Sequence, residues 1–353
     1  MGLKFTPLLA ILLVKLSSCS SEVPQIRVAC DNNASGVYSV KWELFPQTEG
    51  KVKIYSSFNP DFTGPLYFEQ EKSISDGFSI MSRKEDDRRQ FFRLVFDKKY
   101  TAYVSERHIA TDRISNLRDL GGYFRGKTRQ MKWAKLYRSG ALAWMSEKDE
   151  VTLDSLHIKT IVDLRDERTT PLLRTKYNAD QTIHLGLHML SIDTVRQKIL
   201  NDQMKKGDVL ISLQDMYAHV LEKDTTSLIQ LFDILTDEER YPLLYHCFLG
   251  KDHAGLVSIL ILEALGIDRE LIFYDYMLSN QFIDFSRIIS KTSDLSHEAE
   301  APLATLISAN EQLFNFVYDK VRMDYGSMNQ YLSNVLHVTD KKREKLREIL
   351  FYQ

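Results

Sequence analysis

The chain has 353 residues, of which 44% are hydrophobic and 27% are charged. This composition is typical of a globular protein, and the length favours two domains over one. The net charge of −2 and the lack of a run of Lys and Arg give no electrostatic case for nucleic-acid binding, so no nucleic-acid partner is expected.

The first 19 residues have the pattern of an export signal. A short basic start precedes an apolar stretch that is too short and too interrupted, by Lys15, to span a membrane. The segment LSSC (16–19) resembles a bacterial lipobox, in which the chain is cut before the Cys and the Cys is lipidated; a plain signal peptide is the alternative. The lipobox interpretation makes Cys19 the lipidation site and residues 20–24 a tether. It places the protein in the bacterial cell envelope, lipid-anchored at the periplasmic face or on the outer membrane.

Residues 25–110 are expected to form a small all-β sandwich. Hydrophobic and polar side chains alternate in VYSVKWEL (37–44) and RQFFRLVF (89–96), and KVKIYSS (51–57) and YTAYVSERHI (100–109) are further short runs between turn-forming residues. Alternation with a period of two is typical of strands that bury one face. The early Trp and the late aromatic strand resemble a fibronectin type III or immunoglobulin-like module; another small all-β domain is the alternative.

Residues 111–353 have the pattern of an α/β domain. IKTIVDLRD (158–166) and YPLLYHC (241–247) are predicted strands, whereas AGLVSILILEALG (254–266) and LQDMYAHVLEKDTTSLIQLFDIL (213–235) have helical spacing. Strands that alternate with helices indicate a mainly parallel central sheet flanked by helices, with ligands at the carboxyl ends of the strands. The segments DLRD and HCFLGKD both follow a predicted strand, so we expect them to converge on one pocket.

Three cysteines are few for an exported protein, and no disulfide framework is implied. Cys30 is most simply a small buried hydrophobic residue. Cys247 is left available as a thiol.

The stretch HCFLGKDHAG (246–255) is expected to be a phosphate-binding loop. Backbone N–H groups between a strand and the first turn of a helix favour an oxyanion, and the same field is expected to lower the pKa of Cys247. A thiolate there can attack a phosphate monoester to give a phosphocysteine that water then hydrolyses. Gly250 allows close backbone approach, Lys251 adds positive charge, and Asp252 can serve as general acid.

This stretch is close to H-C-x-x-G-K-D-R-T-G, and the chain therefore resembles the bacterial tyrosine phosphatases of the dual protein-tyrosine and serine/phosphoinositide type. The resemblance extends over about residues 111–353. It is carried, in the family's order, by NLRDLGGY (116–123), KWAKLYRSGAL (132–142), IKTIVDLRDERT (158–169), DYMLSNQF (275–282) and YGSMNQYLSNVLHVTDKKREKLREIL (325–350). It implies a cysteine-dependent phosphoric monoester hydrolase with no cofactor and no metal.

By position, the resemblance makes Cys247 the nucleophile and Asp252 the general acid, with His246 tuning the pKa of the thiol. The predicted catalytic residues are Cys247, Asp252 and His253. The substrate-binding residues that it implies are His246, Phe248, Leu249, Gly250, Lys251, Ala254, Gly255, Asp163, Arg165 and Arg138. An alternative stays open for Arg118, Asp119, Arg138 and Arg165, which would instead form a buried ion-pair network under the loop.

The chain departs from the signature at two positions of the loop. His253 stands where the family has Arg, whose guanidinium grips two phosphate oxygens and is always charged, whereas imidazole offers at most one donor. Ala254 stands where the family has Thr. Three hypotheses follow: a phosphatase with lowered rate and an acidic optimum, a pseudophosphatase that binds an anionic ligand without turnover, and a site for another anion or another cysteine reaction.

The expected partner is a phosphorylated protein or a small phosphate monoester, together with the membrane through the lipid anchor. Phosphotyrosine, phosphoserine and phosphoinositide remain alternatives, and the oligomeric state is left open. The helical segment 195–235 is a candidate lid over the site, because it lies between the two predicted site strands. Residues 291–303 are expected to form a polar loop.

Overall fold

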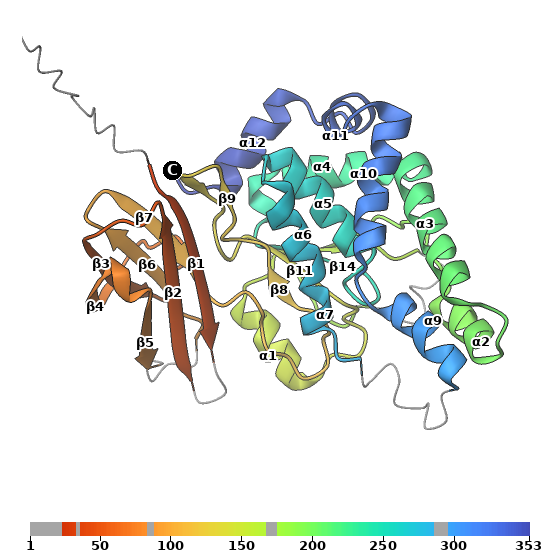
Figure 1. The fold of residues 1–353 in the computed structure, drawn as a ribbon, viewed down its shortest axis with the longest axis horizontal. Helices are drawn as coiled ribbons and strands as arrows, with labels where there is room; N and C mark the ends of the chain where they lie inside the picture. The colour runs from red at the N-terminus through yellow and green to blue at the C-terminus, as the bar shows by residue number, and fades with distance from the viewer. Residues whose placement is uncertain (1–22, 33–35, 83–87, 167–174, 286–295) are drawn as a thin grey trace, which may run out of the picture.

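A computed structural model of the chain describes residues 23–32, 36–82, 88–166, 175–285 and 296–353. The predicted export signal, with Cys19, lies outside these residues. Figure 1 shows an all-β region beside a larger α/β region, with the labelled helices gathered in the larger one.

The β region contains two antiparallel sheets. The first has the order β1-β2-β5 and the second the order β4-β3-β6-β7. The strands are β1 (Gln25–Asn32), β2 (Val37–Phe45), β3 (Lys51–Ser57), β4 (Tyr67–Ser73), β5 (Phe78–Ser82), β6 (Phe91–Phe96) and β7 (Tyr100–Val104), with a 3₁₀ turn at Ile74–Asp76. The predicted strands at 37–44, 51–57 and 89–96 are therefore confirmed. The run at 100–109 forms a strand only over its first half.

The two sheets enclose one core, which makes the region a sandwich. Tyr38 and Trp42 of β2 face Phe92 and Leu94 of β6, and the Tyr38 and Phe92 rings meet edge to face with centroids 5.2 Å apart. The Trp42 indole N–H donates to the Ile74 carbonyl at 2.8 Å, so its polar atom is satisfied inside the core. Cys30 is buried in the same core, as expected.

The α/β region is built on a five-stranded sheet with the order β13-β12-β14-β11-β8. The strands are β8 (Arg118–Asp119), β11 (Leu136–Ser139), β12 (Thr160–Asp163), β13 (Gln181–His184) and β14 (Leu243–His246). Four of them are parallel, and β8 pairs with β11 in the antiparallel direction. This confirms the predicted mainly parallel sheet, with a two-stranded hairpin of β9 (Phe124–Arg125) and β10 (Arg129–Gln130) beside it.

Helices cover both faces of this sheet, because alternate strand residues enter two separate cores. Ile161 and Leu244 face a core that includes Leu153 of α1 (Glu147–Ser155), while Val162 and Leu243 face a much larger helical core. The remaining helices are α2 (Ile192–Leu200), α3 (Lys206–Lys223), α4 (Thr225–Leu235), α5 (His253–Leu265), α6 (Arg269–Met277), α7 (Ser279–Phe282), α9 (His297–Ile307), α10 (Glu311–Tyr325), α11 (Met328–Gln330) and α12 (Asp340–Leu350), with a 3₁₀ turn at Glu238–Arg240 and a π-helical turn at Tyr331–Val335. Nearly every residue of α5 is buried, as its uniformly apolar sequence predicts.

The helical spacing predicted at 213–235 is confirmed by α3 and α4, which meet at Asp224, whose carboxylate accepts the N–H of His188 at 2.7 Å. One expectation about the helices was wrong in part. The predicted loop 291–303 overlaps α9, because Ala299 and Leu303 repeat with helical spacing and enter the core beside α2 and α3. Residues 291–295 lie outside the described residues.

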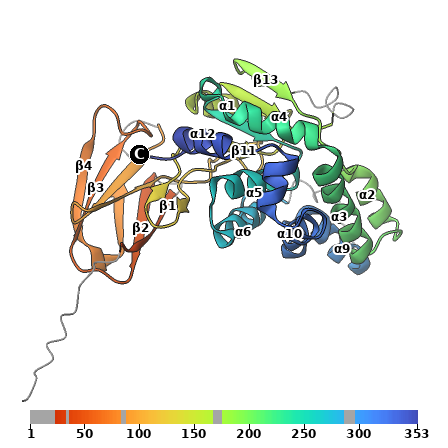
Figure 2. The same cartoon turned by 90° about the horizontal axis from the view of Figure 1, so that it is seen from above.

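The two regions meet through specific contacts. Arg89 donates to Asp119 at 2.8 Å across the junction, and Trp133 packs into the core of the β-sandwich. Figure 2 shows α12 and the C-terminus at this junction. Among the described residues, no helix has both the length and the apolar character that crossing a membrane would require.

Candidate active site

The loop that carries Cys247 runs from the carboxyl end of β14 to the first turn of α5. Cys247 is buried, with 3% of its surface exposed, and α5 begins at His253. The structure therefore places Cys247 between a strand and a helix N-terminus, as the sequence indicated, and its role as nucleophile stays a prediction.

The conformation of the loop requires glycine at position 250. Gly250 has φ +70°, and a Cβ atom there would lie 2.6 Å from the Ser139 carbonyl carbon and 2.7 Å from the Gly140 nitrogen. Its carbonyl accepts from Asn116 Nδ2 at 2.9 Å and from Arg138 Nη2 at 2.7 Å. The loop is thus clamped against β11 on one side and tied by two side-chain donors.

A buried carboxylate supports these donors. Asp275 of α6 lies 2.8 Å from Arg138 Nη1 and 3.4 Å from Arg118 Nε, with all three side chains essentially inaccessible. Burial by itself raises the pKa of Asp275, but Arg118 and Arg138 outweigh it and bring the pKa to about 2. Burial, and then repulsion from Arg138, lowers the pKa of Arg118 to about 10. Arg118 and Arg138 therefore form a buried ion-pair network, and Arg138 braces the loop through Gly250.

Asp163 and Arg165 form a second buried pair at the end of β12. Arg165 donates through Nε and Nη2 to the two Asp163 oxygens at 2.8 and 2.6 Å. Burial alone raises the pKa of Asp163, but Arg165 and His246 hold it below its ordinary value. Asp163 Oδ2 lies 3.7 Å from His246 Nε2, so the ends of β12 and β14 converge as expected. Neither Asp163 nor Arg165 lines the cavity above Cys247, and substrate contact by Arg165 stays a prediction.

His246 makes the fold sensitive to acid. Burial lowers the pKa of His246 from 6.5 to about 4, so the unfolded chain binds its proton first as the pH falls. The resulting loss begins near pH 6.5 and is complete near pH 4, and it amounts to about 3 kcal/mol of unfolding free energy. Urea unfolding from pH 7 to 4.5 should show this fall, and His246→Gln should reduce it, leaving the part due to His253 and His108, whose pKa values burial also lowers. Asp163 and Asp275, whose pKa values are lowered, change the unfolding free energy only below pH 4. If the dependence of the unfolding free energy on pH were unchanged in His246→Gln, His246 would not be the source of the acid sensitivity.

The pKa of Cys247 differs from the expectation. Burial raises it above its ordinary value, and Asp252 raises it further, while the backbone N–H groups of Ala254 and Gly250 act in the opposite direction. The predicted backbone cradle is present, but its field does not overcome the loss of water around the sulfur. The closed site therefore holds Cys247 as a thiol.

Asp252 is held as a hydrogen-bond acceptor. Lys251 Nζ donates to its carboxylate at 2.7 Å, and the Tyr217 hydroxyl of α3 donates to the same oxygen at 3.2 Å. Lys251 is fully buried, so its ammonium faces Asp252 and not open solvent. Burial raises the pKa of Tyr217 well above its ordinary value, which keeps the hydroxyl protonated as a donor.

His253 lines the same cavity as Cys247, and its imidazole is hydrogen-bonded to a backbone carbonyl. Its Nε2 donates to the His188 carbonyl at 3.0 Å, which leaves Nδ1 as an acceptor with no hydrogen-bond partner among the described residues. Burial lowers its pKa, so the ring is neutral near pH 7. The His188 ring in turn stacks on His219 with centroids 4.0 Å apart.

The cavity above Cys247 is small and mostly apolar. Its volume is about 20 Å³, which is room for about one water molecule. It is lined by Met189, Leu190, Ile192, Leu213, Met216, Cys247, Phe248, Leu249, Asp252, His253 and Leu306. We call the segment 188–192 together with α2 and α9 the cap. From the expected lid at 195–235, Leu213 and Met216 of α3 line this cavity. The rest of its cover comes from the cap, where the sequence indicated no lid at 188–192 or in α9.

Several residues of the site escaped the sequence analysis. Asn116 and Asp275 lie inside segments that carry the family resemblance, and that signal could have found them. Ser258 Oγ accepts a hydrogen bond from Arg138 Nη1 at 2.7 Å. Tyr217 donates to Asp252, and the His188 carbonyl accepts from His253. No local motif marks these three. Within the described ranges, no group of three or more His, Cys, Asp or Glu is placed to hold a metal ion.

The α/β region is similar to known tyrosine phosphatases. Residues 109–352 match the model of the tyrosine phosphatase family. A Cupriavidus necator protein named as a candidate tyrosine-protein phosphatase (H16_A0669) is 26% identical over 245 residues, which are 67% of this chain and 87% of that protein. The triple specificity protein phosphatase PtpB of Mycobacterium tuberculosis is 52% identical over 42 residues, or 12% of this chain and 15% of PtpB.

A solved structure gives a weaker likeness. The core catalytic domain of the PP-IP phosphatase SIW14 from S. cerevisiae is 16% identical, with a TM-score of 0.25 over 44% of this chain and 87% of that one, which adds nothing to the assignment. The family match covers more than half of the chain and includes the loop, its bracing network and the sheet beneath. The chain belongs to the tyrosine phosphatase family.

Proposed function

We propose that this protein hydrolyses phosphate monoesters, phosphotyrosine or a related ester, through a phosphocysteine at Cys247 and at a reduced rate. The observation that carries the proposal is the position of the Cys247 sulfur. It lies just after β14, at the start of a buried helix. There the backbone N–H groups of Gly250 and Ala254 interact with the sulfur and act to lower its pKa. These groups are the donors that a phosphate bound above the sulfur would meet.

The residues around the loop supply a route for the protons. As the substrate binds, the Cys247 thiol passes its proton to the Asp252 carboxylate, which lines the same cavity. The resulting thiolate attacks phosphorus, and the S–P bond forms while the ester P–O bond breaks. The leaving oxygen takes a proton through Asp252, which lies 2.7 Å from the Lys251 ammonium. In the second step Asp252 accepts a proton from water, the water oxygen bonds to phosphorus, and the S–P bond breaks to release the thiolate.

Two features limit this reaction. His253 offers no charged fork to the phosphate oxygens, and its one N–H is occupied by the His188 carbonyl. The cap leaves no room for a phosphate monoester above Cys247, so a substrate has to displace it. Protonation of His253 supplies a cation only below pH 6.5, because burial lowers its pKa. Activity is therefore expected to increase toward pH 5.

The second candidate is a pseudophosphatase that binds a phosphorylated or anionic ligand without turnover. The engagement of His253 by the cap favours it, because the residue at the arginine position then has a structural partner and no catalytic one. The loop, its bracing network and the buried Lys251 would be retained in such a protein for binding alone.

Hydrolysis of p-nitrophenyl phosphate from pH 5 to 8 tests the two candidates. The proposal expects slow turnover that increases toward pH 5 and is lost in Cys247→Ser. Turnover unchanged in Cys247→Ser would exclude the phosphocysteine route. No turnover at any pH, with thermal stabilisation of the chain by phosphotyrosine, would establish the binding-only function.

The proposed place of action is the cell envelope, with the chain anchored through a lipid on Cys19. The support is the sequence of residues 1–19 alone. Labelling with a fatty-acid analogue in a bacterial host tests it, because Cys19→Ala should abolish the label. Label retained in that variant would remove the anchor from the proposal.

A further inference from the structure

A second cavity lies at the junction of the β-sandwich and the α/β region, separate from the site at Cys247. Its volume is about 630 Å³, which is within the usual range of small-molecule sites, and domain junctions are a preferred place for such sites. We call it the junction cleft. It shares no lining residue with the cavity above Cys247.

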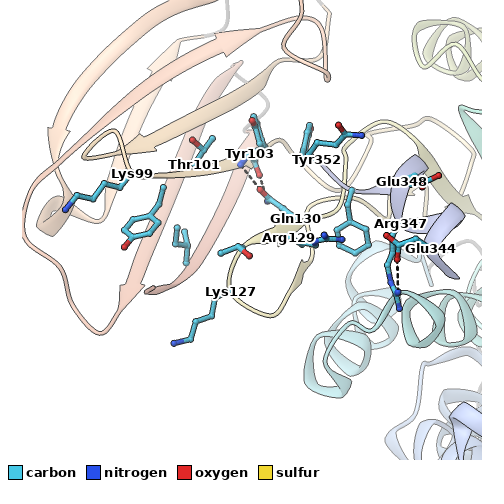
Figure 3. A pocket seen from close by; sticks show the side chains of 15 residues that line it. Lys99, Thr101, Tyr103, Lys127, Arg129, Gln130, Glu344, Arg347, Glu348 and Tyr352 are labelled. Carbon is cyan, nitrogen blue, oxygen red and sulfur yellow. Dashed lines mark hydrogen bonds and ion pairs between the residues drawn. The ribbon is translucent and has the colours of Figure 1, made fainter. Parts of the chain in front are cut away.

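Three structural elements form the walls of the junction cleft, as Figure 3 shows. Lys99, Thr101 and Tyr103 come from the sandwich, and Arg129 comes from the β9–β10 hairpin. Arg347 comes from α12, in the third wall. A ligand in the cleft would therefore contact both regions of the protein.

The floor of the junction cleft is already fixed in the absence of a ligand. The Gln130 side chain accepts the N–H of Tyr103 at 2.7 Å and donates to its carbonyl at 2.6 Å. The Tyr103 ring stacks on Tyr352 with centroids 3.9 Å apart, and the Tyr352 hydroxyl donates to the Pro60 carbonyl at 2.8 Å. Binding there would cost little ordering of the protein, because these side chains are held from both sides.

Positive charge in the junction cleft exceeds negative charge. Four basic residues line it, Lys99, Lys127, Arg129 and Arg347, against two acidic ones, Glu344 and Glu348. Lys127 has an interaction of its own, so the excess of positive charge comes from Lys99 and Arg129. Both acids already face basic groups, since Glu344 accepts from Arg347 at 3.2 Å and Glu348 lies 3.9 Å from Lys345, outside the cleft. Within the described part of the chain, no ion pair neutralises Lys99 or Arg129.

The arginines on the hairpin and α12 also repel one another. Burial, followed by repulsion from Arg347 and Arg129, lowers the pKa of the neighbouring Arg125. The Arg347 Nε is buried and has no hydrogen-bond partner among the described residues. Arg347 therefore keeps an unsatisfied donor beside its pair with Glu344, and Arg129 has no ion pair among the described residues. Guanidinium donors of this kind at a preformed cavity recognise phosphate or carboxylate oxygens.

We propose that the junction cleft binds a small soluble anion with at least two phosphate or carboxylate groups. Separate walls carry Lys99, Arg129 and Arg347, so a single small anion would leave part of the positive charge unmatched. The walls also carry the aromatic rings of Tyr100 and Phe351, which favour a ligand with some apolar surface between its charged groups. This inference does not depend on whether Cys247 turns over a substrate.

Calorimetric titration of the full chain with pyrophosphate and with citrate tests the proposal. We expect wild-type protein to bind at least one of the two. The double variant Lys99→Glu/Arg129→Glu should weaken that binding by about tenfold or more, because two charge-assisted contacts are reversed. Both side chains are exposed, so the variant without ligand should unfold at the wild-type temperature.

A matched control makes the same change in net charge elsewhere. Lys159→Glu/Lys341→Glu reverses two exposed lysines outside the cleft, one of them on α12 itself, and should bind the anion as wild type does. Equal weakening in both double variants would show a general charge effect and overturn the site. Binding that is intact in Lys99→Glu/Arg129→Glu, or absent from wild type for both probes, would overturn it as well.

Discussion

Replacement of His253 by Arg is expected to raise the rate of p-nitrophenyl phosphate hydrolysis by about 100-fold or more. A guanidinium at the first position of α5 supplies the charged two-pronged donor that the neutral His253 ring lacks. The same change removes the hydrogen bond from Nε2 to the His188 carbonyl, which frees the cap over Cys247. The measurement is kcat/KM for the variant and wild type at pH 7.

Two controls separate the guanidinium from the release of the cap. His253→Gln changes the contact with His188 without adding a charge, and a rate near that of wild type would assign the gain to the guanidinium. Cys247→Ser in the His253→Arg background should abolish turnover. An inactive His253→Arg protein that keeps its stability would mean that more than one residue of the site has been lost, with Ala254→Thr as the next change to add.

Replacement of Asp275 by Asn is expected to lower the free energy of unfolding by about 3–5 kcal/mol. Arg118 and Arg138 are fully buried and share this carboxylate, so its neutralisation leaves two guanidinium groups inside the protein without their counter-charge. The hydroxyl of Tyr123, 3.0 Å from Asp275, loses its charged acceptor as well. Urea unfolding at pH 7 measures the loss.

The matched control for Asp275→Asn is Asp319→Asn on the surface of α10. Asp319 pairs with Arg322 at 3.0 Å, but both side chains are more than half exposed, and the expected change is below about 1 kcal/mol. A similar small loss for Asp275→Asn would mean that water or a rearranged partner compensates the two arginines. In that case the network could not be what holds Gly250 in place.

The sequence alone determined the class of the fold and the place of Cys247, the predicted nucleophile, between a strand and a helix. Strand–helix alternation predicted the parallel sheet, and the run from Cys247 to Asp252 identified the loop between β14 and α5. Such patterns succeed because they are local: a strand, a glycine with positive φ and the start of a helix are encoded in a few adjacent residues. The alternation of β2 and β6 predicted the sandwich for the same reason.

Only the tertiary structure decided what surrounds Cys247. The network of Arg118, Arg138 and Asp275 joins residues up to 157 positions apart, and the contact between His253 and His188 spans 65 positions. The raised pKa of Cys247 likewise follows from burial under the cap, which no local pattern encodes. Desolvation and buried ion pairs depend on which distant segments meet, so the sequence placed the reactive residues while packing set their charge and access.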